Sequence, residues 1–252
     1  MKTIKKALVI LDQFSNAQPV WGVTELSSAT GINKSIVHKI LASLIEGDLI
    51  ARDPENRRYR LGSGIVRLAG RHLSNLQPLE IARPHLFRLW EETEETIHYT
   101  ISNKGVNLIV QVYESPQSLR VSAHLGETGS YHGTAAGKVF LAFGNTQIKS
   151  QVLASPLEKH TPKTITDENQ LEAEIDQVRQ DGFATSQEEL EIGFCAISTP
   201  VFDPAGNMLG AVTVAIPVSR FNEKNIHHCR SLLFQATHKI MEEFGMDFSL
   251  RS

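Results

Sequence analysis

Two short helices joined by a glycine turn constrain the fold of this chain most strongly. Thr24 predicts the N-cap of the first helix, and Gly31 predicts its C-terminal end. Asn33 predicts the N-cap of the second helix, which continues to Gly47. The second helix has one apolar face, formed by Val37, Ile40, Leu41 and Leu44. This spacing predicts a helix-turn-helix within residues 24–47.

A helix before this pair and a hairpin after it complete the predicted N-terminal unit. Apolar side chains at helical spacing predict the first helix: Ile4, Ala7, Leu8, Leu11 and Phe14. The hairpin turns at residues 53–56, and it carries four arginines: Arg52, Arg57, Arg58 and Arg60. A hairpin directly after the second helix is typical of a winged helix-turn-helix.

The second helix of the pair begins with hydrogen-bond donors that lie off its apolar face. The N-terminal end of a recognition helix reaches the base edges of DNA, and wing arginines contact the backbone or the minor groove. We therefore expect a surface that binds double-stranded operator DNA, formed by Asn33, Lys34, Ser35, His38, Lys39, Arg52, Arg57 and Arg58. The alternative is a plain three-helix bundle with a hairpin, whose basic face is only solvated.

The charge distribution agrees with a DNA-binding N-terminal unit. The net charge of the whole chain is −3, which by itself argues against a nucleic-acid partner. Residues 1–62, however, contain nine Lys and Arg against six Asp and Glu. The remaining residues contain 16 basic and 22 acidic side chains. A basic N-terminal part on an acidic body predicts that only the N-terminal part contacts a polyanion.

The rest of the composition is typical of a globular protein in a reducing compartment. Hydrophobic residues make up 41% of the chain, and its two cysteines are too few for a disulfide framework. The apolar run Ala7–Leu11 is interrupted by Asp12, so it is too short for a secretory signal. No apolar run approaches the ~20 residues of a membrane span. We expect a cytoplasmic protein with no membrane partner.

Several motifs, in order along nearly the whole chain, resemble those of the IclR (isocitrate-lyase-regulator) family. Three resemble its DNA-binding domain: residues 24–31 (TELSSATG), 33–39 (NKSIVHK) and 59–62 (YRLG). Four resemble its effector domain: residues 134–142 (TAAGKVFLA), 161–166 (TPKTIT), 187–193 (QEELEIG) and 199–203 (TPVFD). The resemblance implies a homodimer or a dimer of dimers. It also implies a regulator of catabolic genes, usually a repressor and sometimes an activator, that responds to a small organic or aromatic acid.

The resemblance and the residues together predict three parts of the chain. Residues 1–62 form the winged helix-turn-helix, and residues 63–77 form a linker helix that begins at Ser63 and is ended by Pro78. The family places a dimerising linker helix here, although a buried connector is the alternative. Residues 78–252 form an effector domain whose fold, by resemblance, is GAF-like.

The pattern of the C-terminal part predicts an α+β fold, with antiparallel strands and helices around them. We expect helices at residues 79–95, 134–143, 167–182 and 222–244, the third with a capping box at Asp167 and Gln170. We expect strands at residues 96–102, 106–114, 119–124, 196–202 and 209–217. Residues 126–133 are expected to form a loop before the second of these helices.

The family resemblance also predicts the effector-binding residues. They are His132, Thr134, Ala135, Ala136, Ser186, Ala196, Thr213 and Ala215. Ser186 stands where family members that bind small oxo-acids tend to have an acidic residue, and Ala196 and Ala215 stand where cysteine and serine are common. Cys195 precedes Ala196, so it is expected to face away from the site. Fewer donors favour a carboxylate with an aromatic ring or several carbons.

Other chemistry is expected to be absent. Cys195 and Cys229 have no recognisable nucleophile context, so we expect neither catalysis nor a cofactor. Residues 227–229 (HHC) point about 100° apart on a helix, so they cannot bind one metal ion together. Acidic residues 188, 189 and 191 are expected in a solvated loop, and His98 remains open between an effector contact and a structural role. Two alternatives persist: a C-terminal domain that only oligomerises, and a metabolite-binding enzyme.

Overall fold

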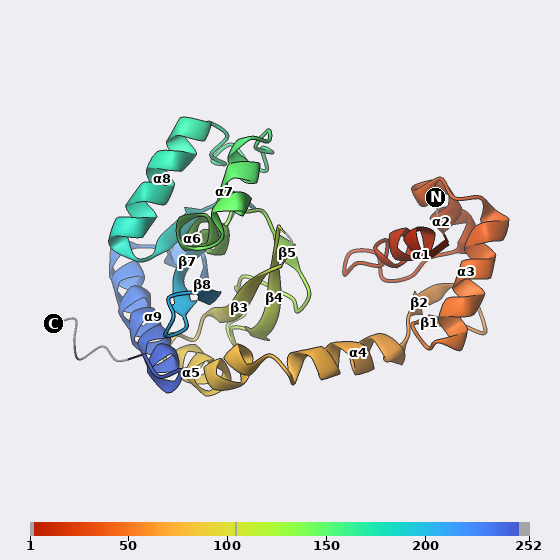
Figure 1. Cartoon of the computed structure of the whole chain (residues 1–252), viewed down its shortest axis with the longest axis horizontal. Coiled ribbons are helices and arrows are strands. Elements are labelled where there is room, and N and C mark those ends of the chain that lie inside the picture. Colours follow the sequence, from red (N-terminus) through yellow and green to blue (C-terminus); the bar gives the residue numbers. More distant parts are fainter. Residues whose placement is uncertain (1–2, 104, 247–252) are drawn as a thin grey trace. The chain divides into compact units, whose positions relative to one another are not determined.

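The computed structural model describes residues 3–103 and 105–246 of the chain. It divides into two compact units, Met1–Asn75 and Leu76–Ser252, and each is considered by itself (Figure 1). Helix α4 (Ser63–Leu73) belongs to the first unit. Pro78 does not end a linker helix, because it lies in the first turn of the next helix, where a missing N–H is tolerated.

The first unit is a small helical domain with a two-stranded hairpin. Its elements are α1 (Thr3–Leu11), α2 (Val23–Thr30), α3 (Lys34–Glu46), β1 (Ile50–Arg52), β2 (Tyr59–Leu61) and α4. Its buried core consists of Ile10, Leu26, Ile32, Val37, Ile40, Leu41, Ile50 and Tyr59. The predicted winged helix-turn-helix is therefore confirmed.

The apolar face expected for α1 is only partly correct. Ile10 is fully buried, whereas Ile4 and Leu8 are 76% and 55% exposed. Helical spacing identifies one side of a helix, but it does not identify what covers that side. In this chain, the side that packs on the core is rotated towards Ile10.

The helix ends of the first unit explain how α3 is placed. The N-cap of α2 is Gly22 rather than Thr24, and the Glu25 carboxylate accepts the Gly22 N–H at 2.8 Å. Gly31 ends α2 with φ +66°, a left-handed conformation that favours glycine. The predicted cap at Asn33 is confirmed, since its side chain accepts the Ser35 N–H at 2.9 Å.

The second unit is built on a six-stranded antiparallel sheet with the order β5-β4-β3-β8-β7-β6. The strands are β3 (Thr96–Asn103), β4 (Val106–Tyr113), β5 (Thr128–Gly129), β6 (Ala184–Gln187), β7 (Phe194–Phe202) and β8 (Met208–Pro217). The helices are α5 (Gln77–Thr93), α6 (Ala135–Phe143), α7 (Thr146–Leu153), α8 (Glu168–Asp181), the short 3₁₀ helix Val218–Arg220 and α9 (Glu223–Glu243). The predicted α+β class is confirmed.

Helices pack on this sheet in two groups. Helices α5 and α9 pack on each other, α5 also on β3 and α9 on β7, while α6 packs on α8, β7 and β8 (Figure 1). The predicted cap at Asp167 is confirmed, because its carboxylate accepts the Gln170 N–H at 2.8 Å. No helix within residues 3–103 and 105–246 has the length and apolar character needed to cross a membrane.

The segment at residues 119–124 is not the strand that its sequence predicts. Its backbone joins no ladder, and the Val121 carbonyl instead accepts the Thr96 hydroxyl at 2.6 Å. The chain returns to the sheet only at β5. Helix α7 and strand β6 were not expected, since each is short and has little apolar periodicity of its own.

Candidate nucleic-acid interface and ligand cavity

The start of α3 presents the donors expected of a recognition helix. Lys34, Ser35, His38 and Lys39 are all exposed, on the side away from the buried Val37 and Ile40 of the same helix. The Ser35 hydroxyl donates to the Asn33 side chain at 2.8 Å. The residues expected on this helix to contact DNA therefore form one surface.

The wing is held firmly against the rest of the first unit. Strand β1 pairs with β2 in the register Ile50↔Leu61 and Arg52↔Tyr59. Tyr59 also exchanges two backbone hydrogen bonds with Trp21, at 2.8 and 2.9 Å. The hairpin is thus fixed at its base.

The wing arginines differ in their surroundings. Arg58 makes two bonds to the Glu25 carboxylate, at 2.7 and 3.1 Å, and one to the Val20 carbonyl at 3.2 Å. The Gly22 N–H and then Arg58 lower the pKa of Glu25 below its usual value. Arg57 is exposed, with φ +59°, and Arg52 lies 5.8 Å from the Tyr59 ring. No pattern in the sequence predicted these contacts of Arg58 within its own unit.

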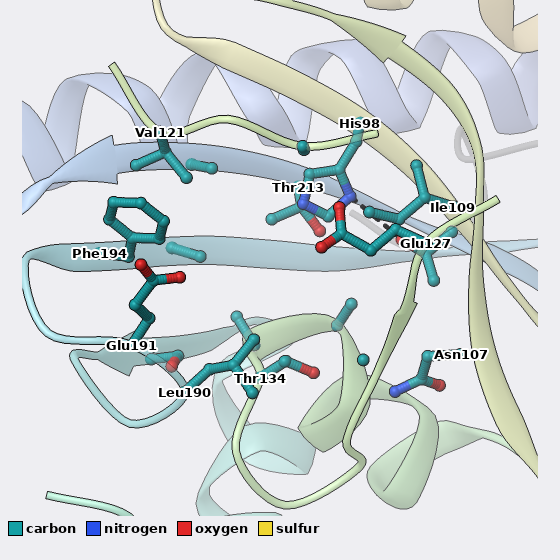
Figure 2. Close-up of a pocket in the computed structure, with 18 of the residues that line it drawn as sticks. His98, Asn107, Ile109, Val121, Glu127, Thr134, Leu190, Glu191, Phe194 and Thr213 are labelled. Carbon is teal, nitrogen blue, oxygen red and sulfur yellow. Dashed lines mark hydrogen bonds between the residues drawn. The ribbon is translucent and has the colours of Figure 1, made fainter. Parts of the chain in front are cut away.

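A cavity of about 140 Å³ lies in the second unit between the sheet and the start of α6 (Figure 2). Seven of the eight predicted effector-binding residues line it: Thr134, Ala135, Ala136, Ser186, Ala196, Thr213 and Ala215. Cys195 also belongs to the lining, although it was expected to face away. An apolar cavity of roughly this volume can hold a benzene ring, so there is room for a small ligand.

His132 is separated from the other seven residues. Its Nε2 atom lies 2.8 Å from the Glu158 carbonyl, and its ring stacks on His160 with centroids 5.5 Å apart. It is buried and absent from the cavity lining. His132 lies two positions before Thr134, the cap of α6, and its side chain contacts the neighbouring loop instead of the cavity.

The register of the sheet explains why the small residues meet at the cavity. Ala215 lies opposite Ala196, which in turn lies opposite Ser186. His98 lies opposite Thr213 in the same way. Directly paired residues point to the same face of a sheet. Side chains from four strands therefore form two adjacent rows on one face.

The start of α6 closes the other side of the cavity. Thr134 caps the helix, since its hydroxyl oxygen accepts the Gly137 N–H at 3.0 Å and its hydroxyl donates to the Ser130 carbonyl at 2.7 Å. A Cβ at Gly137 would lie 2.3 Å from the Tyr131 carbonyl oxygen, so only glycine fits there. In the described part of the chain no acceptor is bonded to the Ala135 and Ala136 amides. A ligand oxygen can accept both.

Several lining residues were not predicted. His98 lines the cavity, its Nδ1 atom lies 3.1 Å from the Thr100 hydroxyl, and burial lowers its pKa to about 4. Asn107, Glu127, Glu191 and Phe194 also line the cavity. Asn107 left one signal in the sequence, because it is the only polar residue in the apolar run 106–110.

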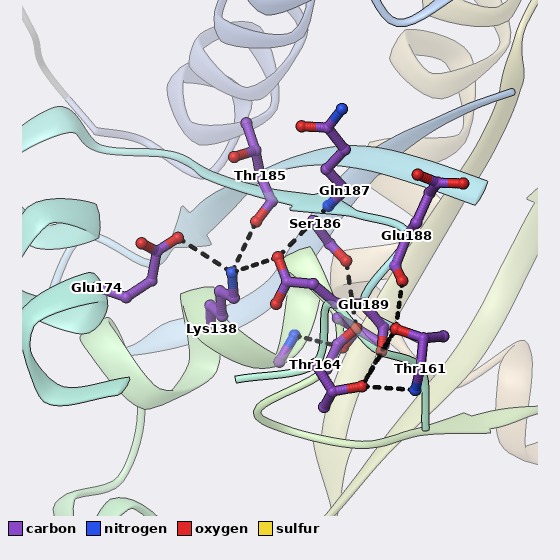
Figure 3. A network of polar contacts seen from close by, with 12 residues as sticks. Lys138, Thr161, Thr164, Glu174, Thr185, Ser186, Gln187, Glu188 and Glu189 are labelled. Atoms are coloured by element: carbon purple, nitrogen blue, oxygen red, sulfur yellow. Dashed lines mark hydrogen bonds and ion pairs between the residues drawn. The ribbon is translucent and has the colours of Figure 1, made fainter. Parts of the chain in front are cut away.

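The loop between β6 and β7 is tied to α6 by a buried ion pair (Figure 3). Lys138 Nζ lies 2.8 Å from Glu189 Oε1, 3.0 Å from Glu174 Oε1 and 3.1 Å from the Thr185 carbonyl. Glu189 is 8% exposed, so the expectation of a solvated loop is wrong at this position. The next two residues, 190 and 191, line the cavity. The pair therefore fixes one wall of the cavity to the helix that forms another.

The Glu189 backbone is fixed from its other side as well. The hydroxyls of Thr161 and Thr164 donate to the carbonyls of Glu188 and Glu189, at 2.7 and 2.6 Å (Figure 3). Glu188 itself has φ +57° and pairs with Lys163. These contacts join residues 161–166 to residues 187–193, two segments that lie apart in the sequence.

The two cysteines are buried and kept as thiols. Burial raises the pKa of the Cys195 thiol, and it raises that of Cys229 to about 11. Thiolate is the reactive form, so neither residue is poised as a nucleophile. Within the described residues, no three His, Cys, Asp or Glu side chains are placed to hold a metal ion.

Both units match models of known domains. The model described as the IclR helix-turn-helix domain matches residues 3–54, and that of the bacterial transcriptional regulator IclR C-terminal domain matches residues 70–242. The chain belongs to the IclR family. An IclR-family protein of this kind is a DNA-binding transcription regulator, and the family resemblance of the sequence is confirmed.

Individual IclR regulators agree with this assignment. The transcriptional regulator KdgR of Escherichia coli K12 is 28% identical over 246 residues, which cover 97% of this chain and 93% of KdgR. An IclR regulator structure from Silicibacter sp. TM1040 has a TM-score of 0.83 and 31% identity, covering 98% of this chain and 97% of that one.

A third relative supports the fold. The structure of an IclR homologue from Microbacterium hydrocarbonoxydans, complexed with 4-hydroxybenzoate, has a TM-score of 0.84. It is 18% identical and covers 97% of this chain and 99% of that one.

Proposed function

We propose that this IclR-family protein is a repressor of catabolic genes whose DNA binding is controlled by a small organic acid in the cavity of its C-terminal unit. The observation that carries the proposal is the cavity itself, which is lined by Ala135 and Ala136 at the start of α6, whose amides have no bonded acceptor among the described residues. Such amides and the helix dipole favour an anion. The homologue complexed with 4-hydroxybenzoate supports an acid as the effector.

Operator DNA would be contacted by α3 and by the wing. The exposed donors of α3 can reach base edges, and the exposed wing turn can reach the flanking backbone. Because the partner is chromosomal DNA, the protein would act in the cytoplasm. The DNA-binding residues proposed are Asn33, Lys34, Ser35, His38, Lys39, Arg52 and Arg57, with Arg58 supporting the wing.

A homodimer or a dimer of dimers would bring two recognition helices to one operator. Support comes from α4, where Val66 and Leu68 are 73% and 51% exposed. Large apolar side chains on an exposed helix favour burial against another surface. Only Gly64 of α4 is buried, which disfavours a buried connector.

Two measurements with the full-length protein test the proposal. Fluorescence anisotropy with DNA from the promoter region next to the gene measures operator binding, and thermal unfolding with a panel of organic and aromatic acids measures effector binding. A ligand that binds only the native state raises Tm. An acid that raises Tm and releases the DNA is the expected result. DNA binding that no acid changes would favour a C-terminal unit that only oligomerises.

A further inference from the structure

We propose that the effector is a carboxylate that also carries hydroxyl or ammonium donors, and that Asn107, Glu127 and Glu191 accept hydrogen bonds from those donors. This inference rests on the proposed function of the same cavity, and it names the chemistry of the ligand. Its basis is the balance of donors and acceptors among the lining residues.

Asn107 is the strongest observation. Asn107 is 2% exposed and lines the cavity, yet its Oδ1 atom has no hydrogen-bond partner in the described part of the protein. Its Nδ2 atom makes one long bond, 3.4 Å from the Ser130 carbonyl. A buried acceptor without a donor is costly, and such atoms are rare in folded proteins. A ligand donor in the cavity would satisfy it.

Three hydroxyl groups of the lining, those of Thr134, Ser186 and Thr213, cannot supply donors to a ligand without losing a bond. Thr134 donates its proton to the Ser130 carbonyl, at 2.7 Å. Ser186 donates to the Gly133 carbonyl at 3.2 Å, and Thr213 donates to the Ser198 hydroxyl at 3.0 Å. Each hydroxyl has one proton and two lone pairs. These three residues therefore offer a ligand acceptor sites only.

The charges of the lining also favour a ligand that carries hydrogen-bond donors. Glu127 and Glu191 both line the cavity (Figure 2), and no Lys or Arg is among the described residues that line it. The low pKa of His98, about 4, leaves its ring neutral near pH 7. One Glu127 oxygen accepts the backbone N–H of His124 at 2.9 Å, and no partner among the described residues bonds the other Glu127 oxygen or the Glu191 carboxylate. Ionised carboxylates only accept hydrogen bonds.

The cavity therefore has two parts, one that offers hydrogen-bond donors to a ligand and one that offers acceptors. The amides of Ala135 and Ala136 have no bonded acceptor among the described residues, and together they suit one carboxylate. Elsewhere the lining holds the unpaired Asn107 Oδ1 atom and two negative charges, those of Glu127 and Glu191. A plain carboxylic acid would satisfy the amides but would leave Asn107 unpaired and would be repelled by the two glutamates. A carboxylate with hydroxyl or ammonium groups satisfies both parts.

Three six-carbon acids test this with the full-length protein: hexanoate, gluconate and 6-aminohexanoate. They share chain length and carboxylate, and they differ in having no further donor, hydroxyl donors or an ammonium donor. We expect gluconate or 6-aminohexanoate to bind at least tenfold more tightly than hexanoate in calorimetry, and the tighter of the two identifies the donor. Equal or tighter binding of hexanoate overturns the inference but leaves the proposed function intact. No binding of any of the three counts against both.

Matched variants locate the effect. Asn107→Leu should weaken the binding of the donor-bearing acid at least tenfold without weakening the binding of hexanoate. Should this variant not fold, the exposed pair Glu127→Gln and Glu191→Gln gives the second test. The double variant should bind the donor-bearing acid more weakly and hexanoate more tightly than the wild type does, because it removes both charges that repel a carboxylate. Glu91→Gln, an exposed change on α5 outside the cavity, is the control. Equal effects on both acids would overturn the assignment.

Discussion

The Nζ atom of Lys138 lies 2.8 Å from the Oε1 atom of Glu189, and both residues are buried. They are 51 residues apart in the sequence. Lys138 belongs to α6, whose first turn faces the cavity, and Glu189 belongs to the loop that carries Leu190 and Glu191 into the lining. The pair therefore joins the helix that offers amides to the loop that offers carboxylates.

Lys138→Met should destabilise the protein by about 3–5 kcal/mol, because it leaves the Glu189 carboxylate buried without its cation. Denaturation in urea, followed by circular dichroism, measures this loss. The double variant Lys138→Met with Glu189→Leu should recover most of it, since no unpaired charge remains. Lys149→Met is the control: Lys149 lies 3.6 Å from Glu172 in a more exposed pair. It should cost about 1 kcal/mol or less. Equal losses for the two lysines would contradict a special role for the buried pair.

Ala136→Trp should abolish the effector response while DNA binding is retained. Ala136 is 5% exposed and lines the cavity, so an indole at this position fills the space that a ligand needs. The proposed DNA-contacting residues belong to the other unit. Operator binding is titrated with an acid that raises the Tm of the wild type. Ala154→Trp, on the exposed end of α7, controls for the added indole. A response of Ala136→Trp at wild-type concentrations would place the effector elsewhere.

Local signals in the sequence predicted the parts of the fold that depend on neighbouring residues. The cap at Asn33, the left-handed end at Gly31 and the cap at Asp167 each involve residues within a few positions. The small residues of the cavity followed from the family resemblance.

Long-range contacts could not be predicted in this way. The Arg58–Glu25 pair joins residues 33 positions apart. Residues 119–124 have a strand-like pattern, but in the structure they pair with no strand. The unpaired state of Asn107 depends on the arrangement of three strands and a loop. The pattern of residues in one segment predicts the conformation of that segment. The Arg58–Glu25 pair, the conformation of residues 119–124 and the surroundings of Asn107 depend instead on the other segments that pack beside them.

Arg57→Ala and Arg58→Ala should affect DNA binding differently. Arg57 is exposed at the wing turn, so its loss should weaken binding to all sequences and reduce the slope of log K against log salt by about one unit per lost phosphate contact. Arg58 already pairs with Glu25, so its loss should change that slope less. Its effect on stability should be small, because the pair is exposed to solvent. Anisotropy at several salt concentrations measures both slopes, and equal slopes would show that Arg58 also contacts DNA.

Two acidic substitutions in α4 should separate the subunits of the proposed dimer. Val66 and Leu68 are the largest exposed apolar side chains of α4. Val66 and Leu68 point about 200° apart on the helix, so Val66→Glu with Leu68→Glu changes both sides of α4 and would place a charge in a dimer contact on either side, where desolvation is costly. We expect the wild type to sediment as a dimer or tetramer and the double variant as a monomer with far weaker operator binding.

Footprinting shows the same change on DNA. A dimer that places two copies of α3 in successive major grooves should protect two half-sites about 10 base pairs apart, or a multiple of that spacing. The double variant should lose this symmetric protection but keep its circular dichroism spectrum, because neither side chain is buried in the monomer. Arg71→Glu, on the same helix, adds one acidic side chain without removing an apolar one, and it should leave the dimer intact. A wild-type monomer that protects a single half-site would contradict the proposed role of α4.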